Sequence, residues 1–228
     1  EKMKKALAGV LVACGMVMLT GCAVAKSLDF DSEEAAQNAL DTASVVRFDG
    51  DDIKEVHQTG NIYADGKVAG FLQEEGFLNS QIIISMNDNT WMYQKIVEDE
   101  PSSEELPGEA MGSAYGMFDA NDNAVAYVQE RLMETDVFPR AFYLVFLDVD
   151  GNPTGYLADE EGKNVYDFDG NLVCTGSAQM NGVLGTDYNI EITMEPGTDA
   201  QIDFAYKLGL YAKLYYDLRS WYSLTYSD

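Results

Sequence analysis

Basic residues and histidine are scarce in this chain. Of its 228 residues, 14 are Lys or Arg and 39 are Asp or Glu, which gives a formal net charge of −25 at pH 7. Nucleic-acid binding needs a basic surface that neutralises phosphates, so this balance excludes a general nucleic-acid-binding protein. A single histidine, His57, excludes a metal site built from several histidines, and three cysteines are too few for a disulfide framework. The sequence contains no phosphate-binding loop and no glycine-rich dinucleotide turn, so we expect no cofactor.

The composition is that of a folded domain. Hydrophobic residues make up 46% of the chain and charged residues 23%, which is ordinary for a globular protein. The length fits one large domain or two small ones. Because one strand pattern runs through most of the chain, we expect a single β-rich domain over residues 32–228.

The N-terminal segment has the pattern of a signal peptide. Lys4 and Lys5 come first, and Ala6–Met18 is apolar and uncharged. This run is shorter than the roughly 20 residues that span a bilayer, and it matches the hydrophobic region of a signal peptide. The alternative interpretations of this segment are a buried helix and an ordinary secretory signal peptide.

Leu19-Thr20-Gly21-Cys22 follows directly and resembles the lipobox of bacterial lipoproteins, in which an aliphatic residue and two small residues precede a cysteine. The resemblance implies that residues 1–21 are removed by cleavage between Gly21 and Cys22. It also implies that the Cys22 thiol receives a diacylglyceryl group and anchors the protein to the extracytoplasmic face of a bacterial cell membrane. Residues 22–31 then form a tether.

Removal of residues 1–21 makes the remaining chain more acidic. Lys2, Lys4, Lys5 and Glu1 are lost, which leaves 11 basic against 38 acidic residues and a net charge of −27. Anionic headgroups repel such a surface, so attachment has to come from acyl chains, each buried CH₂ contributing about 0.8 kcal/mol. Cys174 is then the one free thiol, and its apolar neighbours predict a small residue in a strand core.

A short helix is predicted near the start of the domain. Asp31–Glu34 has the residue types of a helix N-terminus, and alanines and Leu40 follow at helical spacing, which predicts a helix of about 12 residues. Asp49-Gly50 is interpreted as the end of this region.

From Ile53 to Ile192 the sequence predicts antiparallel hairpins. Short apolar and aromatic runs alternate with Asp-Gly or Asn-rich turns, which favour tight connections. Asp99–Gly112 is polar and is interpreted as an exposed loop between two halves of the sheet. The five predicted turns are Ala64–Lys67, Met86–Asn89, Asp119–Asn123, Asp150–Asn152 and Asp169–Asn171.

The C-terminal segment predicts a long apolar helix at about residues 199–222. Thr198 and Gln201 have the spacing of a helix N-cap and its partner. Apolar residues then cover most of the helix surface, so we expect it to be buried in the core, with a position on a membrane as the alternative. The fold class is therefore mainly β (α+β), with a hairpin-rich sheet or barrel packed around an apolar C-terminal helix.

This pattern resembles the tubby C-terminal and LURP-one-like superfamily. The segments that carry the resemblance are Phe146–Tyr156, Val165–Thr175 and Asp203–Leu218. The resemblance implies a barrel of roughly twelve strands around a hydrophobic C-terminal helix. In tubby itself basic side chains hold a phosphoinositide headgroup. Basic residues are few and scattered here, so lipid-headgroup binding and the family's functional residues are not carried over.

One acidic turn invites a Ca²⁺ hypothesis. Asp119, Asn121, Asn123 and Glu130 occupy positions 1, 3, 5 and 12 of an EF-hand loop. Position 6 is Ala124, where the EF-hand needs glycine, and the flanks have strand rather than helix patterns. A hairpin turn explains these residues better, so we expect no metal site.

The sequence thus predicts a lipid-anchored, non-enzymatic envelope protein with a binding or scaffolding role and no identified partner or ligand. One alternative is an envelope hydrolase that uses paired carboxylates, which would require two of them across a cleft. The other is a carbohydrate- or solute-binding lipoprotein, for which we expect exposed aromatic side chains such as Trp91 on a concave face.

Overall fold

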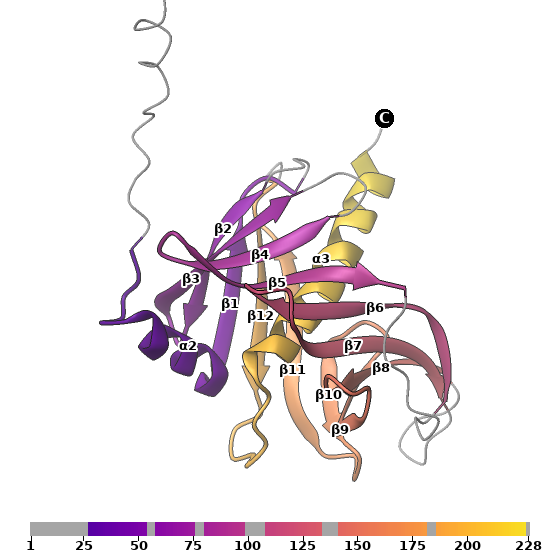
Figure 1. Cartoon of the computed structure of the whole chain (residues 1–228). Coiled ribbons are helices and arrows are strands. Elements are labelled where there is room, and N and C mark those ends of the chain that lie inside the picture. Colours follow the sequence, from indigo (N-terminus) through magenta and orange to yellow (C-terminus); the bar gives the residue numbers. More distant parts are fainter. Residues whose placement is uncertain are drawn as a thin grey trace, which may run out of the picture.

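Alternating apolar residues and short turns fold into one sheet that closes on itself (Figure 1). The computed structural model describes residues 27–53, 58–75, 80–98, 108–133, 141–181 and 186–226. Each strand pairs antiparallel with its neighbours in sequence, and β1 also pairs with β12, so the sheet has no free edge. This confirms the predicted mainly β fold. The elements are α2 (Glu33–Thr42), β1 (Val45–Gly50), β2 (Thr59–Ala64), β3 (Lys67–Glu75), β4 (Gln81–Met86), β5 (Asn89–Val97), β6 (Glu109–Asp119), β7 (Ala124–Met133), β8 (Ala141–Leu147), β9 (Pro153–Asp159), β10 (Asn164–Asp167), β11 (Leu172–Met180), β12 (Tyr188–Met194) and α3 (Phe204–Tyr226).

The five predicted turns all connect adjacent strands. They contain residues with positive φ, among them Asp65 at 46°, Asn87 at 52° and Asp122 at 67°. Asp, Asn and Gly adopt this left-handed conformation more readily than other residues. Each of the five turns therefore has a residue type that suits its backbone conformation. The predicted hairpins are therefore confirmed.

The connections alternate between the two ends of the barrel because neighbouring strands run in opposite directions. The five tight turns lie at the same end as α2, which we call the turn end. Asn87 in one turn donates a hydrogen bond to Glu33 of α2 at 3.0 Å, and Asp65 in another accepts one from the amide of Val45 at 2.9 Å. The opposite end, where the last turns of α3 leave the barrel, is called the exit end (Figure 1).

Helix α3 runs inside the barrel, and its buried side chains belong to the main hydrophobic core together with those of the strands. Leu208, Tyr211 and Tyr215 on this helix are at most 1% exposed, and strands surround them. A helix with so wide an apolar face is stable in water when that face is buried. Helix and wall approach closely at Gly209, where an added Cβ would lie 2.6 Å from a methyl group of Val128 on β7. The prediction of a buried C-terminal helix enclosed by strands is confirmed.

The first strand was not predicted. The sequence pattern predicts strands from Ile53 onward and the end of the helical region at Asp49-Gly50, whereas Val45–Gly50 forms β1. Gly50 is not a turn residue: an added Cβ would lie 2.2 Å from the ring of Tyr188, its pairing partner on β12. The glycine makes room for that ring where the barrel closes.

Helix α3 begins later than predicted. It starts at Phe204 rather than near residue 199, and the Thr198 hydroxyl accepts a hydrogen bond from the amide of Ala200, in the linker before the helix. The amide of Phe204 donates to the carboxylate of Asp41 at 2.8 Å. The helix therefore starts where α2 supplies a cap.

Two other predicted segments differ in extent. Residues 27–30 of the predicted tether lie on the barrel, where Leu28 and Phe30 pack against the core. The predicted loop at Asp99–Gly112 is shorter, because β6 already begins at Glu109, and β5 and β6 pair directly. The signal sequence, the lipobox, and residues 99–107 lie outside the described residues.

Replacing Leu208 by alanine tests the burial of α3. We expect the free energy of unfolding to fall by about 2–5 kcal/mol, because the Leu208 side chain is fully buried and the change leaves a cavity. Leu224 on the same helix is 87% exposed, so the Leu224→Ala control should change it by no more than about 0.5 kcal/mol. Urea unfolding measures the free energy of unfolding of both variants. An equal loss of stability in the two would contradict the burial of α3.

Candidate functional site

The two helices cap each other at the turn end. The Asp41 carboxylate of α2 accepts a hydrogen bond from the amide of Phe204 at the start of α3. In return, the Lys207 ammonium of α3 donates to the backbone carbonyls of Leu40 and Asp41, at 2.9 and 2.7 Å, at the end of α2. We call this arrangement the helix junction. Each charge lies where the dipole of the other helix favours it.

Lys207 is 1% exposed, which is unusual for a lysine. Burial lowers its pKa, while Asp41 acts in the opposite direction. The two carbonyl acceptors supply hydrogen bonds that a buried ammonium would otherwise lack. The helix junction thus fixes both helices at a cost in desolvation.

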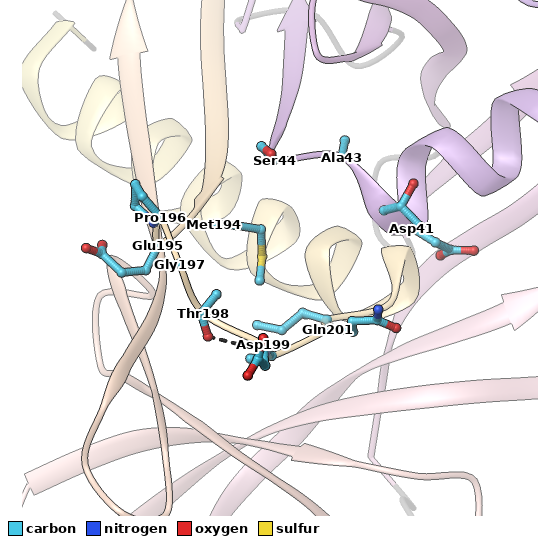
Figure 2. Close-up of a pocket in the computed structure, with 13 residues that line it drawn as sticks. Asp41, Ala43, Ser44, Met194, Glu195, Pro196, Gly197, Thr198, Asp199 and Gln201 are labelled. Atoms are coloured by element: carbon cyan, nitrogen blue, oxygen red, sulfur yellow. Dashed lines mark hydrogen bonds between the residues drawn. The ribbon is translucent and has the colours of Figure 1, made fainter.

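A polar pocket of about 440 Å³ adjoins the helix junction (Figure 2). One side is the corner between α2 and β1, and the other is the linker between β12 and α3. It is the candidate binding site of the described residues. Its lining consists of Asp41, Thr42, Ala43, Ser44, Met194, Glu195, Pro196, Gly197, Thr198, Asp199, Ala200, Gln201 and Ile202.

The pocket presents carboxylates and hydroxyl groups and no basic side chain. Of its carboxylates, Asp41 already serves as the cap of α3, so Glu195 and Asp199 are the acidic groups without a role in the helix junction. Such a lining suits a small polar or cationic group. It does not define a reaction.

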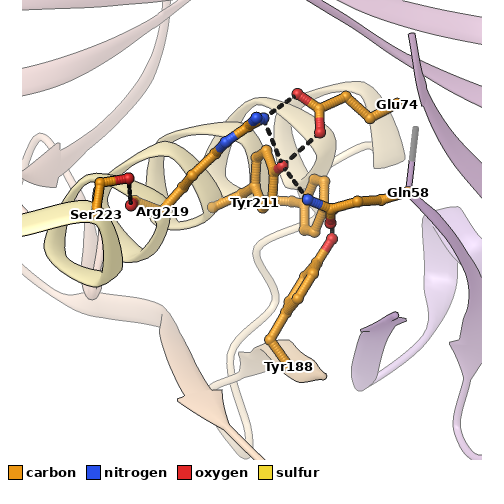
Figure 3. Close-up of polar contacts among 7 residues, drawn as sticks. Gln58, Glu74, Tyr188, Tyr211, Arg219 and Ser223 are labelled. Carbon is orange, nitrogen blue, oxygen red and sulfur yellow. Dashed lines mark hydrogen bonds and ion pairs between the residues drawn. The ribbon is translucent and has the colours of Figure 1, made fainter. Parts of the chain in front are cut away.

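A second polar cluster lies inside the exit end of the barrel (Figure 3). The Glu74 carboxylate of β3 accepts hydrogen bonds from the Tyr215 hydroxyl at 2.5 Å and from the Arg219 guanidinium at 2.6 Å, both on α3. Gln58 donates to the same hydroxyl at 2.8 Å. These four residues are called the exit cluster. Next to them the hydroxyls of Tyr188 and Tyr211 are hydrogen-bonded at 2.8 Å.

The exit cluster contains a buried charge pair whose carboxylate accepts hydrogen bonds from two side chains of α3. Glu74 and Tyr215 are each 1% exposed, and Arg219 reaches in from the rim. Burial and the hydrogen bond to Glu74 raise the pKa of Tyr215 well above its usual range, so the phenol remains a donor to the carboxylate. The cluster fits a structural role, because a charge this deep is tolerated only with such partners.

The candidate Ca²⁺ residues form a hairpin turn. The Asp119 carboxylate accepts hydrogen bonds from the amides of Asn121 and Asn123, and from the Asn123 side chain. Glu130 lies farther along β7, about 20 Å from the turn at the rise of a strand. The described residues contain no group of three or more His, Cys, Asp or Glu side chains placed to hold a metal ion.

Of two other predicted residues, one lies in the core and the other packs against it. Cys174 is buried on β11, and burial raises the pKa of its thiol to about 12, which confirms its interpretation as a small core residue. Trp91 stacks on Phe204 at 5.0 Å between ring centroids, so it packs against the start of α3 and does not form an exposed platform for a sugar. His57 and Cys22 lie outside the described residues.

The residues of the helix junction and the exit cluster were missed by sequence reasoning. Their partners are far apart in sequence, from 141 residues for Tyr215 and Glu74 to 167 for Lys207 and Leu40. The sequence offers one local signal, which is that Lys207 and Arg219 are charged residues in a largely apolar helix.

Comparisons of the chain with protein-family models, with curated proteins and with solved structures found no match. Neither described helix combines the length and apolar character needed to cross a membrane.

The Tyr215→Phe variant tests the exit cluster. It removes a donor from the buried Glu74 carboxylate, and we expect the free energy of unfolding to fall by about 1–3 kcal/mol. Tyr216 is the matched control, because its buried hydroxyl has no hydrogen-bond partner among the described residues. Urea unfolding should show no loss of stability for Tyr216→Phe, and a loss as large as that of Tyr215→Phe would argue against the cluster.

The acidic turns predict a pH dependence of stability. Hydrogen bonds from the asparagine four residues farther on lower the pKa of Asp119, Asp148 and Asp167. Groups with a lowered folded-state pKa stabilise the fold above the unfolded value of about 3.9, and this contribution is lost as the pH falls through the lower folded value. Replacing all three by asparagine should therefore flatten the decline in stability on acidification.

This decline is measured by urea unfolding from about pH 6 to about pH 2. The control is Asp150→Asn, since Asp150 contributes its backbone amide to its turn. If the free energy of unfolding of the triple variant depends on pH in the same way as that of the original protein, the three turn aspartates do not cause the loss of stability in acid.

Proposed function

We propose that this chain is a lipid-anchored protein of a bacterial cell envelope and that its barrel is a binding or scaffolding domain rather than an enzyme. Cys22 carries the anchor, and the domain lies on the extracytoplasmic side of the membrane. The observation that carries the proposal is the order of a charged start, an apolar run of signal-peptide length and the lipobox at Leu19-Thr20-Gly21-Cys22.

The position of the domain supports this proposal. The lipobox ends at Cys22, and Leu28, six residues later, already packs against the barrel core. A folded domain directly after a short tether is the arrangement expected when an acyl chain, and not a spanning helix, attaches a protein to a membrane.

The filled barrel supports a binding role on the outside or at the ends of the barrel. Side chains of α3 occupy the barrel axis, and the described pocket of about 440 Å³ lies at the turn end. A solute enclosed within the barrel would compete with α3 for the same space.

The fold also supports, as a proposal, the resemblance to the tubby C-terminal and LURP-one-like superfamily. A closed barrel of twelve strands around a C-terminal helix is the architecture that the resemblance implies. The departure in charge remains, so the proposal covers architecture and not phosphoinositide binding.

The Cys22→Ser variant tests the anchor. In a bacterial host fed with an alkyne fatty acid, the chain with Cys22 in place should incorporate the label and sediment with membranes. Cys22→Ser should lose the label and shift to the soluble fraction, because only the thiol of Cys22 receives the acyl group. Cys174→Ala is the control, since this buried thiol should not affect labelling. Full membrane attachment of Cys22→Ser would overturn the proposal.

A further inference from the structure

We propose that the barrel stands on the membrane with its turn end toward the bilayer and its exit end pointing away, held off the surface by its own negative charge. This inference rests on the proposed acyl anchor at Cys22. It adds an orientation and identifies the anionic bilayer surface as the partner that the turn end faces.

The place where the tether leaves the barrel sets which end is near the membrane. Asp29 is fixed to the start of β3 by two hydrogen bonds: its amide donates to the Val68 carbonyl, and its carboxylate accepts from the Val68 amide, both at 2.8 Å. This contact is beside the turn that joins β2 and β3. The chain between Cys22 and Asp29 spans at most about 25 Å when fully extended, so the turn end stays within that distance of the anchor.

The turn end carries charge of nearly one sign. Its basic residues are Lys67, the buried Lys207, Arg47, which pairs with Asp49 at 3.0 Å, and Lys95, which pairs with Asp122 at 3.7 Å. The acidic residues around the tether contact and in α2 include Asp29, Asp31, Glu33, Glu34, Asp65 and Asp88, and the other turns at this end add further aspartates.

Repulsion and the tether together orient the barrel. The acidic body is driven away from anionic headgroups over a distance of about one Debye length, about 10 Å in 0.1 M salt. The tether holds it at the turn end, so the separation is greatest when the exit end points away from the bilayer. Helix α3 has 23 residues and a length of about 35 Å, which places its last turn far from the surface. Trp221 and Leu224, 52% and 87% exposed, then face the envelope space.

Energy transfer from the protein to labelled lipids measures this orientation. The full-length lipidated protein carries a donor dye on one introduced cysteine, either Ala120→Cys in an exposed turn at the turn end or Ser220→Cys on the exposed exit end of α3. Acylation blocks Cys22, and Cys174 is buried, so the dye reports on the introduced thiol. The vesicles contain either phosphatidylglycerol or only phosphatidylcholine, with acceptor dyes on headgroups.

We expect at least about twofold more energy transfer from Ala120→Cys than from Ser220→Cys, given the length of α3. Raising the salt concentration from about 0.01 to about 1 M shortens the Debye length from about 30 to about 3 Å. Transfer from Ala120→Cys should then rise on phosphatidylglycerol vesicles and stay constant on phosphatidylcholine.

Three outcomes would count against the inference. Energy transfer from Ser220→Cys that equals or exceeds that from Ala120→Cys would overturn the orientation. A salt response that is the same on both lipids would overturn the proposed electrostatic repulsion between the barrel and the bilayer. Failure of the protein to float with vesicles of either composition would overturn the anchor at Cys22 itself. Flotation is scored before energy transfer, so the failure of the anchor is distinguished from the failure of the orientation.

Discussion

Apolar packing alone leaves the rotation and depth of a helix inside a barrel poorly defined, and polar contacts near the two ends of α3 define both. At the turn end, Lys207 and the amide of Phe204 bind α2, and at the exit end Tyr215 and Arg219 bind Glu74. Hydrophobic burial provides most of the favourable free energy, but it is non-directional and hardly distinguishes one rotation of the helix from another. The buried hydrogen bonds, which are costly if unmade, define one position of α3. The helix junction and the exit cluster are therefore best understood together, as the two fixed points of the core.

Closure of the sheet depends on the same helix. The twelve strands pair in a ring in which β1 joins β12, and this leaves no exposed edge to pair with other chains. A ring of this size has an interior too wide for its own side chains to fill. Helix α3 occupies that space, and glycines permit the closest contacts, at Gly209 against β7 and at Gly50 beneath the Tyr188 ring.

The features that the sequence predicts well are local. The Asp-Gly and Asn-rich turns were located because the residues that adopt positive φ lie within the turn itself, and the apolar face of α3 follows from periodicity. The features that it missed depend on distant partners. Gly50 looks like a turn glycine until Tyr188 is placed against it, and Phe204 begins α3 because Asp41 caps it from another helix. Glu74 could not be selected among the many acidic residues, since its partners Tyr215 and Arg219 come from the other end of the chain.

The position of α3 at the end of the described chain affects how the protein folds. Synthesis delivers the chain from its N-terminus, so the twelve described strands all precede the helix that fills the barrel. Until α3 arrives, the incomplete barrel exposes an apolar inner wall and an unpaired rim, both of which favour aggregation. Its native contacts join residues far apart in sequence, and such topologies fold slowly. The fold thus makes the maturation of this protein sensitive to whatever shields the emerging strands before the last helix docks.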